Sequence, residues 1–218
     1  YRRRRHRLDN AARKLRGEGD FVLSRSESYI GTLIDDLVTK GTNEPYRIMT
    51  SRSEYRLLLR QDNADQRLTR RGYEIGLVSE ERLRAVEEKY DAVDREIRRL
   101  THTGASPSPA LSAFLAQRGT ADVTDGCPLG ALLRRPQLHY DDLAPFDPTR
   151  PDLPADVREQ VEIRVKYEGY IQRQQKQVEE FRRMESHRLP PGLDYASIQG
   201  LRLEAREKLS AVQPLDLG

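Results

Sequence analysis

The sequence predicts a mainly α-helical fold, and two observations support that prediction. Apolar residues recur at intervals of three and four in several windows, which places them along one face of a helix. Capping residues and glycines stand at the ends of those windows, where helices begin and end. Only one short segment fits a strand equally well, so helices dominate the prediction.

Two helices are predicted near the start of the chain. Residues 8–16 fit a short helix that Asp9 or Asn10 caps. Residues 26–39 fit an amphipathic helix, and Gly41 stands where a glycine commonly closes a helix in the left-handed conformation. The apolar stripe of this second helix comprises Ile30, Leu33, Ile34, Leu37 and Val38.

The segment 50–60 fits two kinds of secondary structure. Ser51 and Glu54 have the spacing of a capping box, which favours a helix start. Residues 53–59 alternate with charged neighbours in a strand-like pattern that Leu58 breaks. The sequence therefore leaves helix and strand open for this segment.

The strongest helix signals lie further along the chain. Residues 63–73 fit a short helix behind Asp62 or Asn63. Residues 79–100 fit a long helix that begins at Ser79, with acidic residues in its first turn and arginines in its last, as the helix dipole favours. Its apolar stripe comprises Leu83, Val86, Tyr90, Val93, Ile97 and Leu100.

Residues 101–156 hold eight of the twelve prolines, and we expect them to be mainly connecting structure. Short helices fit inside this connection, and longer ones follow it. We expect these helices at about 108–118, 128–134, 156–186 and 202–211.

Composition excludes several classes of protein. No window of about 18 apolar residues occurs, so no membrane span is predicted, and no signal peptide is visible. Cys127 is the single cysteine, which excludes a disulfide framework and a cysteine-based zinc site. The sequence has no Walker loop, no dinucleotide-binding glycine fingerprint and no metalloprotease motif. We expect a cytoplasmic chain with no catalytic constellation and no metal site of its own.

Positive charge is concentrated in the first third of the chain. Residues 1–71 carry 17 basic against 10 acidic residues, whereas residues 72–218 carry 21 against 25. Part of the excess is the run Arg2, Arg3, Arg4, Arg5 and Arg7, which is typical of a solvated tail. This asymmetry indicates a polyanionic partner at one end of the molecule.

The best candidate site is a block of seven arginines within 25 residues, with Tyr46, Tyr55 and Tyr73 among them. Arginine forks bind phosphates and stack on bases, and tyrosine rings also stack, so the block suits a folded RNA such as tRNA. The alternative is internal ion pairing with Asp35, Asp36, Glu44, Asp62 and Asp65, and residue chemistry does not separate the two. The seven candidates are Arg47, Arg52, Arg56, Arg60, Arg67, Arg70 and Arg71.

Four stretches carry a resemblance to a known family. Residues 29–69 read YIGTLIDDLVTKGTNEPYRIMTSRSEYRLLLRQDNADQRLT. LLRRPQLHYDDL (132–143), VKYEGYIQRQQKQV (165–178) and LPPGLDYASIQGLRLEAREKL (189–209) follow. These stretches closely resemble the MnmG (GidA) family, the FAD-dependent subunit of the enzyme that modifies the tRNA wobble uridine.

The resemblance implies a function for the complete family protein. With the GTPase MnmE, the family adds a carboxymethylaminomethyl or aminomethyl group to carbon five of the wobble uridine. FAD, reduced by NADH, takes part, and the family enzyme is a homodimer. The C-terminal part of the family is a helical domain that serves tRNA and MnmE.

The resemblance also implies that this chain is the later part of such an enzyme. Residues 1–28 would end a Rossmann-type FAD domain, 29–78 would be a linker region with the arginine block facing tRNA, and 79–218 would be the helical domain, cut before the last subdomain of the family. Residues 1–8 depart from the family, which a frameshift or a fragmentary gene would explain. The missing tail is linked to MnmE, so we expect that docking to be impaired.

We therefore expect the chain alone to bind neither FAD nor NADH and to be inactive. Arg47, Arg52, Arg56 and Arg60 are the first candidates for RNA phosphates, and the other three arginines are weaker ones. Arg52 or Glu54 could instead brace the wall of the FAD domain. A standalone helical RNA-binding adaptor and a non-functional gene fragment are the remaining alternatives.

Overall fold

The computed structural model describes residues 10, 11, 13–41 and 45–215. The arginine run at 2–7 and Glu44, which the sequence singled out, lie outside the described residues. The chain divides into two compact units, residues 1–171 and residues 172–218. Helices dominate both units, as predicted.

A short helical stretch at residues 10–15, residue 12 aside, opens the described chain. Asn10 fixes it to the extended segment behind it, since its side chain donates to the Phe21 carbonyl at 3.0 Å and accepts the Phe21 N–H at 2.6 Å. Helix α2 (Tyr29–Thr39) follows, with Ser28 at its N-cap accepting the Gly31 N–H. Gly41, just past the end of α2, has φ +64°, so the predicted glycine stop is confirmed.

The buried face of α2 differs from its apolar stripe. Leu33 is buried, but Ile34, Leu37 and Val38 are exposed, and Thr32 and Asp36 are buried in their place. The preceding loop causes this orientation: a Cβ on Gly31 would lie 2.1 Å from the Ser24 carbonyl oxygen, so the backbone of that loop lies directly against this face. The face of α2 that is buried is therefore largely polar.

Segment 50–60 is neither a helix nor a strand. A single 3₁₀ turn, η1 (Thr50–Arg52), is followed by irregular turns. No helix begins at Ser51, and the Glu54 carboxylate pairs with Arg25 at 2.7 Å. Tyr55 and Leu59 are buried and hold the segment on the molecule. Side-chain pairing and burial override the local pattern here.

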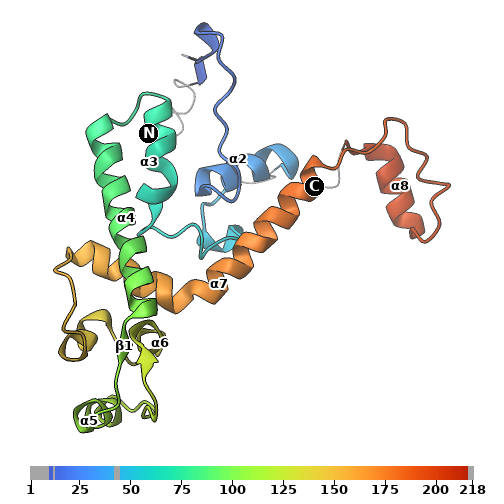
Figure 1. The fold of residues 1–218 in the computed structure, drawn as a ribbon. Helices are drawn as coiled ribbons and strands as arrows, with labels where there is room; N and C mark the ends of the chain where they lie inside the picture. Colours follow the sequence, from blue (N-terminus) through green and yellow to red (C-terminus); the bar gives the residue numbers. More distant parts are fainter. Residues whose placement is uncertain (1–9, 12, 42–44, 216–218) are drawn as a thin grey trace. The chain divides into compact units, whose positions relative to one another are not determined.

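Helices α3 (Ala64–Glu74) and α4 (Glu80–His102) lie side by side and run in opposite directions (Figure 1). Ser79 caps α4 as predicted, by accepting the Arg82 N–H. The predicted stripe of α4 is buried, except for Ile97, which is partly buried. Asn63 precedes α3, but its side chain binds the Leu58 carbonyl and Arg67 instead of capping the helix.

The proline-rich connection contributes much of the hydrophobic core. Strands β1 (Gly104–Ala105) and β2 (Cys127–Pro128) pair antiparallel and bring its start beside its middle, with Ala105 opposite Cys127. Helices α5 (Pro109–Gln117) and α6 (Leu129–Leu133) lie near the predicted positions, and the 3₁₀ helix η2 (Tyr140–Phe146) follows. Buried side chains of this region are Leu111, Leu115, Leu129, Leu132, Leu133, Leu138, Tyr140 and Leu143.

Helix α7 (Ala155–Ser186) has residues in both units. Its first half buries Val157, Val161 and Val165 against the core that α4 and α6 share. Its second half belongs to residues 172–218, with α8 (Leu203–Val212). In that unit the Leu189 N–H donates to the Leu215 carbonyl at 2.9 Å. Among the described residues, no helix is long and apolar enough to cross a membrane.

Candidate nucleic-acid interface

The structure sorts the seven arginines into two groups. Arg47, Arg52 and Arg56 are exposed, on the segment between α2 and α3. Arg47 and Arg56 make no ion pair or side-chain hydrogen bond with any residue that the structure describes. These two guanidinium groups are thus available to a ligand.

Arg52 is exposed, but its side chain contacts the ring of Tyr46. Its guanidinium carbon lies 4.3 Å from the centre of the Tyr46 ring, a cation–π contact. Stacking occupies the flat face of a guanidinium and leaves the N–H groups at its edge, where they can donate to a phosphate oxygen. Arg52 is therefore both oriented and able to bind an anion.

The guanidinium groups of Arg60 and Arg67 bind groups of the protein itself. Arg60 pairs with Asp62, with 3.0 Å between Nε and Oδ1, and donates to the Leu57 carbonyl at 2.7 Å. Arg67 donates to Asn63 Oδ1 and to the Arg60 carbonyl, each at 3.0 Å, and also to the Glu27 carbonyl. Burial, followed by the nearby charge of Arg60, lowers the pKa of Arg67. Both guanidinium groups stabilise turns of the backbone.

Arg70 and Arg71 lie on α3 and pair with acids from other elements. Arg70 pairs with Glu87 of α4. Arg71 pairs with Glu27 at 2.8 Å, and the hydrogen bond and charge of Glu27 raise the pKa of Arg71. Three of the seven candidates make internal ion pairs, but only Arg60 pairs with an acid that the sequence indicated, Asp62. The partners of Arg70 and Arg71, Glu87 and Glu27, were not indicated, and Arg67 is held by hydrogen bonds alone.

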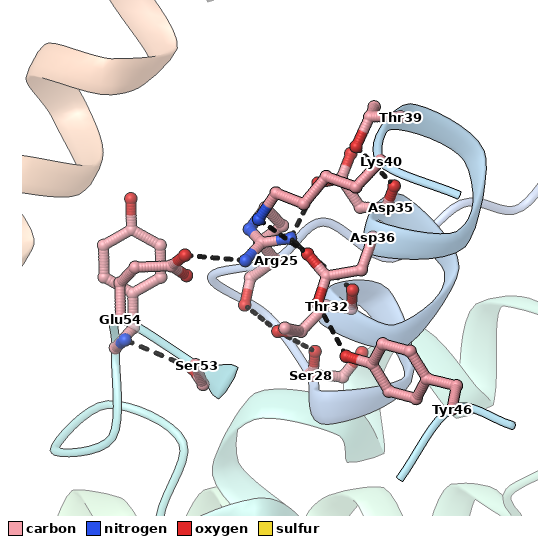
Figure 2. Close-up of polar contacts among 11 residues, drawn as sticks. Arg25, Ser28, Thr32, Asp35, Asp36, Thr39, Lys40, Tyr46, Ser53 and Glu54 are labelled. Atoms are coloured by element: carbon pink, nitrogen blue, oxygen red, sulfur yellow. Dashed lines mark hydrogen bonds and ion pairs between the residues drawn. The ribbon is translucent and has the colours of Figure 1, made fainter. Parts of the chain in front are cut away.

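Arg25 is a central residue that the sequence did not single out. It lies before α2, and its Nη1 contacts Asp35 Oδ2 at 2.8 Å and Asp36 Oδ1 at 2.7 Å, while Nη2 contacts Glu54 Oε1 at 2.7 Å (Figure 2). The side chain of Arg25 is 14% exposed and that of Asp36 only 6%. One guanidinium thus joins α2 to the segment that carries the free arginines. Asp35 and Asp36, which the sequence considered as partners of the arginine block, pair with Arg25 instead.

Asp36 has three partners and remains ionised. Tyr46 donates its hydroxyl to Oδ2 at 2.6 Å, and Arg25 and Lys40 contact Oδ1 (Figure 2). The Tyr46 hydrogen bond, together with those of Arg25 and Lys40, holds the pKa of Asp36 well below its ordinary range, although burial opposes this. Burial and the bond to Asp36 raise the pKa of Tyr46. We call Arg25, Asp36, Tyr46 and Glu54 the anchor cluster.

No second chemical centre stands out elsewhere in the described part of the chain. Within it, no group of three His, Cys, Asp or Glu side chains could hold a metal ion. A cavity of about 450 Å³ lies between η2 and the start of α7. Its lining mixes both charges, and several of its side chains pair with one another: His139 Nδ1 is hydrogen-bonded to Glu162, and Asp141 pairs with Arg158.

Comparisons with known families match most of the chain. The C-terminal helical domain of the tRNA-modifying enzyme MnmG/GidA matches residues 80–175. The C-terminal helical bundle of the same enzyme family matches residues 177–218. These two matches begin where α4 begins and continue through α8.

Individual relatives extend the likeness to the segment before α4. The tRNA uridine 5-carboxymethylaminomethyl modification enzyme MnmG of Caldicellulosiruptor saccharolyticus is 52% identical over 209 residues, which are 96% of this chain and 33% of the relative. The MnmG protein of Bacillus subtilis is 49% identical over 208 residues, 95% of this chain and 33% of the relative. A crystal structure of Aquifex aeolicus GidA has a TM-score of 0.72 at 38% identity, covering 95% of this chain and 32% of that one. The chain thus spans about a third of the length of these relatives.

Proposed function

Because the chain belongs to the MnmG/GidA family and corresponds to its C-terminal portion, we propose that it binds tRNA for an enzyme that modifies the wobble uridine. The observation that carries this proposal is the group of three exposed arginines, Arg47, Arg52 and Arg56, on the one segment between α2 and α3. Each arginine can bind a phosphate with two parallel N–H donors.

The proposal gives different roles to the two groups of arginines. Arg47, Arg52 and Arg56 bind RNA phosphates, which supplies affinity without sequence preference. Arg60, a first candidate from the sequence, joins Arg67, Arg70 and Arg71 as a proposed RNA ligand of lower rank, because each of these four already binds a group of the protein. The sequence of the tRNA is then read elsewhere in the complete enzyme.

The activity of the complete enzyme follows as a wider proposal. The chain would serve addition of a carboxymethylaminomethyl or aminomethyl group to carbon five of the uridine, in the cytoplasm and as part of a homodimer that works with MnmE. Residues 1–28 would end a Rossmann-type FAD domain, with 29–78 as linker region and 79–218 as helical domain.

The redox cofactors of that enzyme do not fit the residues described here. A dinucleotide binds at a glycine-rich turn at the edge of a parallel sheet. The described residues form only one antiparallel pair of two-residue strands, and the sequence lacks the glycine fingerprint. We assign FAD and NADH to the portion of the family protein that the chain does not match, and no step of the reaction to residues of this chain.

Replacement of Arg47, Arg52 and Arg56 by Ala tests the RNA assignment. We expect the affinity for an unmodified tRNA transcript to fall, and the slope of log affinity against log salt to become shallower by about 0.7–0.9 for each phosphate that the variant no longer binds. Fluorescence anisotropy over a series of salt concentrations measures both quantities.

A matched triple variant controls for the change in net charge. Arg82, Arg95 and Arg98 are exposed on α4, so their replacement by Ala removes the same net charge from another surface. We expect that variant to keep the slope. Equal decreases in affinity in the two triple variants would mean that overall charge alone attracts RNA, and an unchanged affinity in the first would refute the proposal.

A further inference from the structure

We propose that Tyr46 and Arg25 are positioning residues for RNA binding: they fix both flanks of the segment 46–54 to α2 and thereby hold Arg52 in one orientation. This inference rests on the proposed function, because it assigns a role to residues that themselves touch no RNA. Three linked contacts carry it, one at each flank and one at Arg52 itself.

The first flank is fixed by the Tyr46 hydroxyl. It donates to Asp36 Oδ2 at 2.6 Å, and Asp36 is 6% exposed on a buried face of α2 (Figure 2). A hydrogen bond to a buried carboxylate is stronger than one between neutral groups. The ring of Tyr46 is therefore held in place at its far end.

The second flank is fixed by Arg25. Its Nη2 binds Glu54 at 2.7 Å, while its Nη1 binds Asp36, the same carboxylate that holds Tyr46. The two flanks are thus joined through one carboxylate and one guanidinium. Loss of the hydrogen bond at one flank therefore also affects the contacts at the other, through the Asp36 carboxylate and the Arg25 guanidinium.

The third contact, between Arg52 and the Tyr46 ring, links the anchored flanks to a side chain that binds phosphate in our proposal. The guanidinium carbon of Arg52 lies 4.3 Å from the centre of the Tyr46 ring, so a fixed ring gives Arg52 a fixed contact. Ordering a rotamer-rich side chain on binding costs affinity, and a side chain ordered in advance avoids that cost. Arg47 and Arg56 have no aromatic ring contact among the described residues. Arg52 is therefore the arginine whose orientation depends on Tyr46.

Tyr46→Phe is the decisive variant, because it removes one hydroxyl and keeps the ring beneath Arg52. We expect the affinity for the tRNA transcript to fall about 2- to 10-fold, the range of one immobilised side chain. The salt slope should stay unchanged, because the phosphate-binding cations all remain. Tyr167→Phe is the matched control, since Tyr167 lies on α7 outside the arginine block, is exposed, and its hydroxyl makes no hydrogen bond with a described residue.

A double-mutant cycle tests whether Tyr46 acts through Arg52. We expect Tyr46→Phe to have no further effect on affinity once Arg52 is replaced by Ala. A merely structural role would cost the same affinity in both backgrounds, and that result would overturn the inference. Thermal unfolding of each variant accompanies the cycle.

Arg25→Lys tests the second flank with the charge kept. A single ammonium cannot span two acids of α2 and Glu54 as a guanidinium does, so we expect a decrease in affinity similar to that of Tyr46→Phe. If Arg25→Lys does not fold, Tyr46→Phe decides alone. Unchanged affinity in Tyr46→Phe, with a decrease in the triple variant at 47, 52 and 56, would overturn the inference and leave the proposed function standing. An unchanged triple variant would overturn both.

Discussion

The core around α4 and the anchor cluster before α3 are held together by different forces. Around α4, α6 and η2 the core side chains are apolar, with leucine the commonest, and several leucines are wholly inaccessible to solvent. Around α2 the contacts are ion pairs and hydrogen bonds, while Ile34, Val38 and Ile48 stay exposed. Apolar burial stabilises without direction, whereas charged hydrogen bonds fix orientation. Apolar packing around α4 therefore sets the fold, and the polar contacts around α2 set the placement of the exposed arginines.

Deleting core volume should give the largest effect. Leu132 is 0% exposed, so Leu132→Ala leaves a cavity, and we expect the free energy of unfolding to fall by about 2–5 kcal/mol. Val38→Ala, at a position 78% exposed, should change it by less than about 0.5 kcal/mol. Chemical denaturation measures both. Similar decreases in the two variants would remove the contrast between the regions.

Replacing the buried carboxylate of the anchor cluster should have a smaller effect that depends on pH. At pH 7 we expect Asp36→Asn to weaken protection of the α2 amides by about 1–3 kcal/mol, because Arg25 and Tyr46 lose an ionised acceptor. The folded pKa of Asp36 is lowered, so its contribution is complete above the unfolded pKa of about 3.9 and is lost as pH falls below it. The difference between the native protein and the variant should therefore shrink from pH 5 to pH 2.

Hydrogen exchange of the α2 amides at several pH values measures that difference. Amides of α4 near Val93, which is wholly buried, serve as the internal control. A difference that grows on acidification would contradict the role given to ionised Asp36.

An exposed ion pair should have the smallest effect. Lys208 and Glu204 of α8 lie 2.7 Å apart, but their side chains are 74% and 78% exposed. Water and salt screen such a pair, so Glu204→Ala should change stability by less than about 0.5 kcal/mol. Thermal unfolding at low and high salt tests this. A decrease as large as that from Asp36→Asn would mean that burial is not what gives the anchor cluster its strength.

Much of the helical structure could be predicted because its signals are local. Ser79 with the stripe behind it placed α4, and Gly41 placed the end of α2. The sequence predicted mainly connecting structure for residues 101–156 and did not indicate that this region contributes to the core. One reason is that α6 is only five residues long, too short to show a helical period. Its leucines are buried through contacts with α4, which a local pattern does not contain.

The candidate site was predictable in outline only. The sequence located the arginine block, but it could not separate Arg52 from Arg67, because the partners that decide their roles are not readable from a local pattern. Arg25 was missed for the same reason: it pairs with Glu54, 29 residues away, and stands alone in its own segment. The only local signal was the adjacent pair of acids at 35 and 36, which required a cation nearby.

The pairing of β1 with β2 has a consequence for how the chain can change over evolutionary time. Because Ala105 faces Cys127, the segment between them leaves the core and returns to the same place. Leu111 and Leu115 of α5 anchor its first part, whereas residues 120–126 are mostly exposed. We expect insertions at residues 124–126 to be tolerated better than insertions within α5 or α6, whose leucines are buried.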